Sequence, residues 1–553
     1  MRKGKLLVIA GVLTVIGLLL ASCGPAAEQP ATGGPTTEQP ATGQPTTGQT
    51  VTGQPAAGGP RGEVTVALTT SGMRKMCDVN TSTTISGGNI KQLLYDSLIW
   101  IDSNSKVQPA LAESWKIADD WSRIDFTLRQ GIKWPNGDPF TAKDVEFTIV
   151  KRLMDTMYHY SGDFKRFVKE VKIVDDYHVS IYVNMPFLTI FDRMNDTGCI
   201  YPKDYFEKVG ADGFAAAPMG LGSFKVIDFK QDQFLNVEAV VDHYRQTPYL
   251  EKLHIVFAPE RTTQLAMIKT GEADIITPEL ALIPDVLADP KLRLSINRGT
   301  SGSALCLHDM MKPNIPTPFH DLRVRQAASL AIDRETMCEK VFYGLNEPAS
   351  QIYQDYNFGY DPTLPVLPYD PVKAKQLLAE AGYPNGFDTT YTYSMATKTE
   401  SEATAAYLSA VGIRARQAPM EAGAYTNLRN TTARNPAGAT SLSGLTIHLN
   451  NYAIGMVHPG AVTQSSIAGG SLMAAGLCNA EEVALVDKML NYNVGDPKLF
   501  ELAQQLNKLV LANAWRAPLW VVHTPWVFGP RIGEYQHTPG KGFNIRYIDI
   551  KLK

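Results

Sequence analysis

One stretch early in the globular part of the chain, "LAESWKIADDWSRIDFTLRQGIKWPNGDPFTAKDVEFTIVKRL" (111–153), carries the pattern that decides the fold. Within it, "RIDFTLRQGIKW" alternates as a β-strand does, and "WPNGDPF" is a cluster of turn-forming residues. The residues after the turn predict a helix, with Thr141 as N-cap and Asp144 in the capping-box position. The helix would bury one apolar stripe, formed by Val145, Ile149 and Leu153. Strand, turn and helix are therefore expected in immediate succession.

The same mixture of strands and helices extends over the rest of the globular sequence. "GEVTVAL" (62–68) alternates strictly, while "YDPVKAKQLLAEAGYPNGFD" (369–388) has the Asp-Pro start and the glycine end of a helix. Such alternation indicates an α/β architecture. The roughly 490 residues from Gly62 onward exceed a single core, so two or more lobes are expected. Without its basic first residues the chain is mildly acidic, which argues against nucleic acid as a partner.

The N-terminus has the features of an export signal. A basic start is followed by an apolar run of about fifteen residues from Leu6 to Leu20, which is short for a membrane-spanning helix. The seam Leu20-Ala21-Ser22-Cys23 resembles the bacterial lipobox, in which cleavage precedes the cysteine and its sulfur receives a diacylglycerol. We therefore expect residues 1–22 to be a lipoprotein signal peptide and Cys23 to be the lipid anchor. The alternative is an ordinary signal peptide that happens to contain a cysteine.

Residues 23–61 form a low-complexity segment with a ten-residue echo, "EQPATGGPTT" and "EQPATGQPTT". The segment has almost no large apolar side chains, so nothing offsets the entropy cost of ordering it. We expect a flexible, lipid-anchored tether that holds a globular body at the membrane surface.

Neither metal binding nor catalysis is indicated by any motif. The remaining cysteines form no C-x-x-C pair, and their odd number leaves the disulfide pairing open (Cys77, Cys199, Cys306, Cys338, Cys478). The sequence lacks H-E-x-x-H, G-x-S-x-G and G-x-x-x-x-G-K-[ST]. We therefore expect no metal, no cofactor and no enzymatic activity.

Four stretches in a fixed order resemble one known family. They are residues 111–153, quoted above, "PMGLGSFKVIDFKQDQFLNVEAVVDHYRQTPYLEKLHIVFAPERTTQLAMIKTGEADI" (218–275), "VRQAASLAIDRETM" (324–337) and "YDPVKAKQLLAEAGYPNGF" (369–387). Together they are similar to the extracellular solute-binding proteins, family 5, of peptide, nickel and oligosaccharide ABC importers. The likeness extends from about Gly62 to the C-terminus.

The resemblance implies a fold of the periplasmic-binding-protein kind (type II, cluster C), with two main lobes, a third inserted lobe and a hinge-closed cleft. Lobe I would comprise 62–96, 185–303 and 520–553, lobe II would be the insertion 97–184, and lobe III would be 304–519. The protein would bind a peptide or similar small solute between lobes I and III, closing about a hinge of crossing strands. It would then dock on the permease subunits of an ABC importer. We expect a monomer, lipid-anchored to the outer face of the cell membrane or periplasmic.

Position in the family also implies residues of the ligand wall. These are Thr84 after the first strand, Tyr158 and Tyr160 in lobe II, Ser303 at the entry to lobe III, and His448, Asn450 and Asn451.

Peptide-binding members carry an acid in a "GW-x-x-DY" segment, and this chain departs from that pattern. The corresponding text is "LTIHLNNYAIGMVHPG" (445–460), which places Asn451 where the acid is expected. A buried ammonium would lack its charge partner there, so an ordinary free-amine peptide is not favoured. Two alternatives stay open, a surface-anchored hydrolase and a ligand sensor. Turnover of candidate substrates would distinguish the hydrolase, and the absence of a neighbouring permease would distinguish the sensor.

Overall fold

The computed structural model describes most of the globular body. Its described residues are 59–69, 85–102, 106–155, 161–184, 190–307, 316–355, 357–421, 424–425, 428, 447–453, 480–489, 491–492, 496–537 and 545–553. Cys23, Cys77, Thr84, Tyr158, Tyr160 and Cys478 lie outside these ranges.

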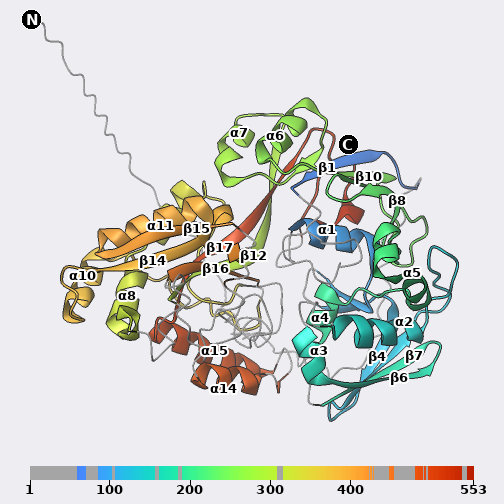
Figure 1. The fold of residues 1–553 in the computed structure, drawn as a ribbon, viewed down its shortest axis with the longest axis horizontal. Helices are drawn as coiled ribbons and strands as arrows, with labels where there is room; N and C mark the ends of the chain where they lie inside the picture. Colours follow the sequence, from blue (N-terminus) through green and yellow to red (C-terminus); the bar gives the residue numbers. More distant parts are fainter. Residues whose placement is uncertain are drawn as a thin grey trace, which may run out of the picture. The chain divides into compact units, whose positions relative to one another are not determined.

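An eleven-stranded sheet dominates the body, in the order β15-β14-β16-β12-β17-β11-β1-β10-β9-β8, with β13 (Glu347–Pro348) also paired to β17. Two long strands, β12 (Arg293–Leu307) and β17 (Arg516–Phe528), lie in the middle of this order, connect its two sides and pair antiparallel with each other (Figure 1). We call the strands on one side the β1 half: β11 (Ile275–Ile276), β1 (Glu63–Leu68), β10 (Lys252–Phe257), β9 (Phe234–Ala239) and β8 (Phe224–Lys230). Those on the other side are the β14 half: β15 (Ile413–Met420), β14 (Phe387–Ser394) and β16 (Ile447–Ala453).

Apolar cores with helices cover the β1 half. The helices are α1 (Ile85–Leu94), α5 (Lys203–Ala216), α6 (Arg261–Thr270) and α7 (Ile283–Leu287), with a short 3-10 turn at Leu280–Leu282. Leu265 and Ile268 of α6 and Val286 of α7 pack with Ala67 and Ile276 of the sheet.

In the β1 half, the two glycines of "GLGSF" lie where a larger residue would not fit. A Cβ on Gly220 would overlap the Leu94 carbonyl oxygen, and one on Gly222 would overlap that of Leu93, both at the end of α1.

Helices also cover the β14 half: α8 (Leu322–Leu330), α9 (Arg334–Thr336), α10 (Pro371–Glu380) and α11 (Lys398–Ala410). Further helical turns lie at Pro318–His320, Met337–Val341 and Met395–Thr397. The predicted helix starting at Asp370 is confirmed, because the Asp370 carboxylate accepts a hydrogen bond from Lys373 N at 2.8 Å. Ala374, Leu377 and Leu378 of α10 join the core of this half.

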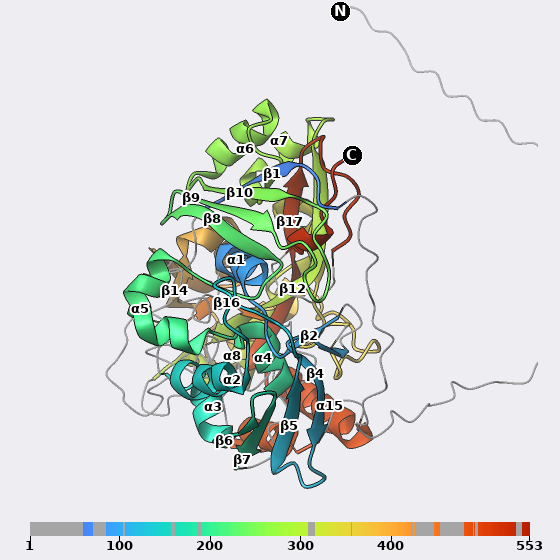
Figure 2. The same cartoon turned by 90° about the vertical axis from the view of Figure 1, so that its right-hand side faces the viewer.

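A separate four-stranded antiparallel sheet has the order β4-β5-β7-β6 (Figure 2). Its strands are β4 (Ala112–Ile117), β5 (Arg123–Leu128), β7 (His178–Val183) and β6 (Val168–Asp175). Three helices accompany it, α2 (Ala142–Phe147), α3 (Ser161–Phe167) and α4 (Ile190–Thr197), and β2 (Ile99–Ile101) pairs with β3 (Val107–Pro109) beside it. We call this unit the small sheet.

The stretch 111–153 forms β4, β5 and α2 of the small sheet and follows its sequence pattern. Asp144 is buried; its carboxylate accepts hydrogen bonds from Thr141 N (3.0 Å), Lys203 N (2.9 Å) and Trp134 Nε1 (3.2 Å). The predicted stripe of Val145, Ile149 and Leu153 is buried as well. One detail differs: after Phe147 the helix widens to a π-helix over Thr148–Leu153.

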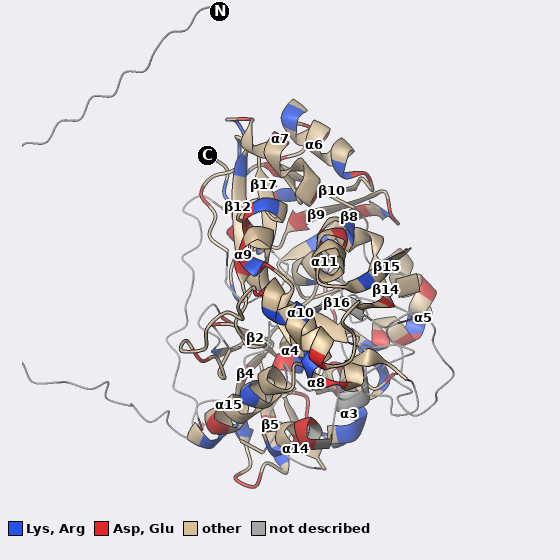
Figure 3. Cartoon of the chain, turned by 90° about the vertical axis from the view of Figure 1, so that its left-hand side faces the viewer, with Lys and Arg blue, Asp and Glu red and all other residues tan. Residues whose placement is uncertain are grey.

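Two C-terminal helices, α14 (Ala480–Met489) and α15 (Pro497–Ala512), complete the described elements, with a final 3-10 turn at Tyr547–Asp549. Leu499, Leu502 and Leu506 of α15 join the core of the small sheet, not that of the β14 half. Arg166 of α3 lies 3.8 Å from Asp487 of α14. The predicted segment 304–519 thus contains helices that pack against the predicted insertion. Figure 3 shows acidic and basic residues interspersed on α5, α14 and α15.

Among the described cysteines, Cys199, Cys306 and Cys338 are buried thiols. Burial raises the pKa of Cys338 to about 12, which keeps this thiol protonated and unreactive. In the described ranges no group of three or more His, Cys, Asp or Glu is arranged to hold a metal ion. None of the described helices combines the length and apolar character that a membrane span needs.

Candidate functional site

The strands of the β1 half end beside β12. Strand β1 runs parallel to β10 and β11, so the carboxyl ends of all three lie at one edge. The last residue of β11, Ile276, is opposite Val527 of β17, which is itself opposite Leu294 of β12. These carboxyl ends therefore lie near Ser295 on β12.

The β14 half approaches β12 from the opposite direction. Strands β14, β15 and β16 are mutually parallel, and β16 is antiparallel to β12. Its last residue, Ala453, is opposite Ser301, and Asn450 is opposite Ala304. The carboxyl ends of this half therefore lie near residues 301–304 of β12.

Both sets of carboxyl ends thus face one short segment, Ser295–Ala304 of β12 with its partners on β17, which we call the crossing. In open α/β sheets, ligands bind outside the carboxyl ends of the strands. The crossing is also irregular: its register with β17 shifts between Asn297 and Ser301, and Gly299 has φ +63°. Such bulges recur beside binding sites, where they redirect side chains and end regular pairing.

The crossing is polar although it is buried. Asn297 and Ser303 are 0% exposed and Ser301 is 2% exposed. The hydroxyl oxygens of Ser301 and Ser303 have no hydrogen-bond partner among the described residues. Leaving a buried polar group unpaired costs about 1–3 kcal/mol. Both hydroxyls are consequently available to a bound molecule or to water.

A histidine connects the two long strands at the bulge. His523 of β17 is 7% exposed, and its Nδ1 accepts a hydrogen bond from Gly299 N at 2.8 Å. Its Nε2 lies 3.4 Å from Glu347 Oε1, and Arg298 lies 3.5 Å from the same carboxylate oxygen. Burial lowers the pKa of His523 below 6.5, while Glu347 raises it in part. The imidazole is therefore held neutral, with Nδ1 as acceptor.

The structure brings part of the predicted ligand wall together. Ser303 is opposite Asn451, Ala304 is opposite Asn450, and Cys306 is opposite His448 in the β12–β16 register. Within the segment 445–460, which the sequence predicts to bind the ligand, residues 447–453 thus form a strand beside Ser303. The side chains of 447–453 are not among those described. Thr84, Tyr158 and Tyr160 lie outside the described residues and remain predictions.

An arginine that the sequence analysis did not single out lies at the carboxyl edge of the β1 half. Arg261 is the first residue of α6, and its Nη1 donates to the carbonyl oxygen (2.6 Å) and hydroxyl of Thr277, directly after β11. The same nitrogen lies 3.2 Å from Gln264 Oε1. No carboxylate of the described residues forms an ion pair with it within 4 Å.

An unpaired acid lies at the corresponding edge of the β14 half. Glu400 is in the first turn of α11, which follows β14 through a single 3-10 turn. Its carboxylate forms no ion pair and no side-chain hydrogen bond among the described residues, and only its own backbone N–H partly lowers its pKa. Burial raises the pKa of Glu400 from 4.5 to about 7. Recognising either residue requires the strand register, because an Arg or Glu at a helix start is ordinary in sequence.

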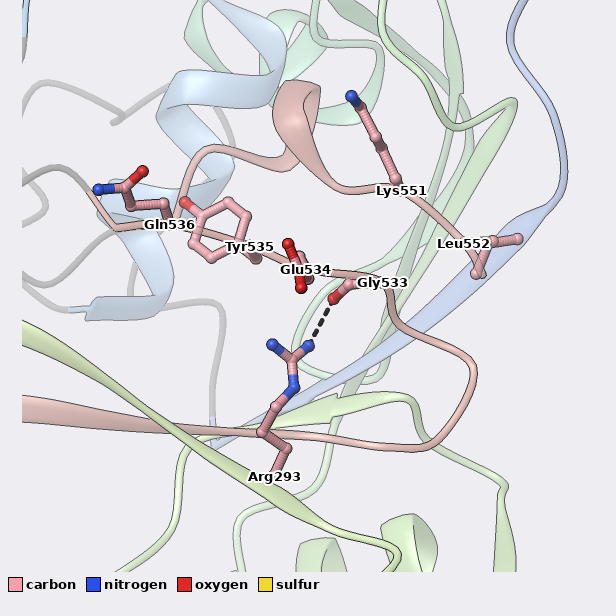
Figure 4. Close-up of a pocket in the computed structure, with 7 residues that line it drawn as sticks. All are labelled: Arg293, Gly533, Glu534, Tyr535, Gln536, Lys551 and Leu552. Carbon is pink, nitrogen blue, oxygen red and sulfur yellow. Dashed lines mark hydrogen bonds between the residues drawn. The ribbon is translucent and has the colours of Figure 1, made fainter.

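A pocket of about 720 Å³ lies elsewhere, beside the first residue of β12 and the C-terminal segment (Figure 4). Arg293 forms one wall, and its guanidinium donates to the Gly533 carbonyl oxygen. The other lining residues are Glu534, Tyr535, Gln536, Lys551 and Leu552. No carboxyl end of the parallel strands contributes to this pocket, so it is distinct from the crossing.

The fold and the crossing define a class, the periplasmic binding proteins. DppA from Helicobacter pylori, an ABC transporter-associated periplasmic binding protein solved with the peptide STSA, matches with a TM-score of 0.74. The match has 21% identity and covers 89% of this chain and 98% of that one. NikA from Brucella suis, solved with Fe(III)-EDTA, matches with a TM-score of 0.77 and 19% identity, over 89% and 100% of the two chains. The predicted α/β periplasmic-binding-protein fold is confirmed.

Within that class the family is also determined. The model of bacterial extracellular solute-binding proteins, family 5 (middle), matches residues 106–452, and the chain belongs to this family, which is one of binding proteins and not of enzymes. Heme-binding protein A of Haemophilus influenzae is 31% identical over 325 residues, 54% of this chain and 58% of that protein. The glutathione-binding protein GsiB of Escherichia coli is 31% identical over 350 residues, 60% and 65% of the two chains. The chain spans about three fifths of the length of these curated relatives.

Proposed function

We propose that the protein is the substrate-binding component of an ABC importer, which captures a peptide or similar small solute at the crossing and delivers it to membrane permease subunits. The observation that carries the proposal is the convergence of strand ends from both halves of the large sheet on the crossing. Relatives named for heme and glutathione binding support a small organic ligand. The ligand is bound and released unchanged.

Capture follows from closure about β12 and β17. In this proposal lobe I comprises 62–96, 185–303 and 520–553, lobe II comprises 97–184, and lobe III comprises 304–519. A ligand that touches both main lobes only in the closed form shifts the population towards closure by its difference in affinity for the two forms. The closed form is then the one that the permease recognises.

We assign the ligand wall to Ser303, His448, Asn450 and Asn451, which the β12–β16 register supports. Thr84, Tyr158 and Tyr160 belong to the proposal through family position alone.

The most informative experiment is mass spectrometry of small molecules that copurify with the protein, followed by X-ray scattering with the identified molecule. We expect a monomer that becomes more compact on binding. Steady turnover of the bound molecule, or binding without compaction, would contradict the proposal.

Anchoring is the second part of the proposal. After cleavage before Cys23, a diacylglycerol on its sulfur would hold the protein at the outer face of the membrane through the tether 23–61. Cells fed labelled fatty acid should label the wild type and leave Cys23→Ala unlabelled and unprocessed. Label on the alanine variant would rule the anchor out.

A further inference from the structure

The guanidinium of Arg261 is held in place by neutral groups alone. Its Nη1 contacts the carbonyl and hydroxyl oxygens of Thr277 and the amide oxygen of Gln264. Gln264 is 0% exposed and is itself fixed, because its Nε2 donates to the Ala258 carbonyl oxygen at 2.7 Å. Thr277 is 4% exposed. The orientation of the guanidinium is thus set before any ligand arrives.

This bonding uses one side of the guanidinium only. Nε and Nη2 have no hydrogen-bond partner among the described residues. Neither atom is among the fully buried, unpaired side-chain atoms, so each keeps some contact with solvent. These are two adjacent N–H groups in the geometry that receives a carboxylate or phosphate with two parallel hydrogen bonds.

The charge of this guanidinium is also uncompensated. Arg261 is half-buried, and burial lowers its pKa, with Glu279 acting weakly in the opposite direction. Yet Glu279 is exposed and forms no ion pair with it within 4 Å. A half-buried charge with no ion-pair partner gains from an anionic group supplied from outside.

The position of Arg261 completes the argument. Residue 261 begins the helix that follows β10, and its partner Thr277 follows β11, so the guanidinium lies at the carboxyl edge of the β1 half. That edge faces the crossing in the strand register.

The geometry points to Arg261 as the residue of the β1 half that binds an anionic group of the ligand, a carboxylate or a phosphate, through Nε and Nη2. The assignment rests on the proposed function and narrows it to ligands that carry a negative charge. Thr277 and Gln264 act as positioning residues.

The test uses a library of N-acetylated tetrapeptides in two forms, with a free C-terminal carboxylate and with a C-terminal carboxamide. Native mass spectrometry measures which form the full chain retains in competition. We expect the wild type to prefer the carboxylate form about tenfold or more, in line with about 1.4 kcal/mol for one charge-assisted pair. Arg261→Gln should reduce that ratio to about one, and Arg261→Lys should keep part of it.

Arg293→Gln is the matched control. Arg293 is the first residue of β12, also donates to a backbone carbonyl and also lacks an ion pair among the described residues, but it borders the pocket of Figure 4 and not the crossing. This variant should keep the wild-type ratio. Thermal unfolding of each variant separates lost folding from lost preference, and Thr277→Val offers a milder change that should lower the ratio without removing the charge.

Three results would overturn the assignment. Equal retention of both forms by the wild type would show that the protein has no preference for an anionic group, while the proposed function would still stand. Unchanged preference in Arg261→Gln shows that another group binds the carboxylate. Retention of neither form overturns the assignment together with peptide capture itself.

Discussion

The two halves of the large sheet present opposite charges at the edges that face the crossing. In the β1 half, Arg261 is fixed by three hydrogen-bond contacts to neutral oxygens. In the β14 half, Glu400 has no such contacts among the described residues, and its pKa rises to about 7 through burial. One edge therefore holds a positioned cation, and the other holds an acid whose ionised form a nearby cation would favour.

The largest expected effect comes from breaking the crossing, on which both edges depend. Trp520 is 2% exposed, stands opposite Ser303 and packs on Phe342 with ring centroids 4.9 Å apart. Trp520→Ala should lower the free energy of unfolding by about 3–5 kcal/mol, as large-to-small core changes do. Denaturant unfolding measures the loss. Trp115→Ala in the small sheet, where the ring is only partly buried, is the control and should cost less.

The sequence could predict the framework because its determinants are local. Asp144, Asp370 and the buried stripe of α2 follow from capping rules and periodicity, and the structure has each of them. The family resemblance supplied Ser303 and the segment 445–460 as candidates, but that residues 447–453 form a strand beside Ser303 is known from the structure alone. Arg261, Glu400 and His523 could not be predicted, because their importance arises from register between strands more than 100 residues apart in the chain. No local pattern distinguishes Arg261 from any other arginine at a helix start.

A second prediction adds a negative charge to the edge of the β14 half by changing Asn451. Asn451, at the carboxyl end of β16, shares its edge with Glu400, and our sequence prediction aligns it with the acid of peptide-binding members. Asn451→Asp should tighten binding of free-amine tetrapeptides by about tenfold, which corresponds to about 1.4 kcal/mol. Calorimetry on matched free and N-acetylated peptides measures the shift, with the acetylated peptide as control. Tight binding of the free peptide to the wild type, lost on acetylation, would mean that a different acid, with Glu400 the first candidate, already serves the amine.

A third prediction removes the acid of the β14 edge. The folded pKa of Glu400, about 7, lies above its unfolded value of 4.5, so ionisation opposes folding as pH rises from about 4.5 to 7. Glu400→Gln should therefore be more stable than the wild type at pH 8, by about 1 kcal/mol after allowing for partial exposure, and equal to it at pH 4. Thermal unfolding at both pH values tests this. Glu402→Gln, which alters an exposed neighbour paired with Lys398, should show no such difference. A Glu400→Gln advantage independent of pH would contradict the argument.

The smallest expected effect concerns His523, which connects β12 and β17 at the bulge, and the pH dependence of folding stability. The pKa of His523 is lowered by burial from 6.5, so above pH 6.5 the imidazole is neutral in both the folded and unfolded states. As pH falls below 6.5 the unfolded state takes up a proton that the folded state resists, and stability is lost through that window. Protonation of Nδ1 also removes the acceptor for Gly299 N and so loosens the bulge that joins the two halves.

His523→Gln offers an amide oxygen in place of Nδ1 and does not titrate, so the loss of stability between pH 7 and 5 should shrink by about 0.5 kcal/mol. His254→Gln, which replaces a histidine of β10 away from the crossing, is the control. Scattering profiles over the same pH range would show whether the two halves change their relative position. An unchanged slope in His523→Gln would mean that the histidine stabilises the bulge without making it sensitive to pH. In that case the crossing would have the same geometry at pH 5 and pH 7. Any pH dependence of ligand binding would then arise from the charges of Arg261 and Glu400 and not from movement of the two halves.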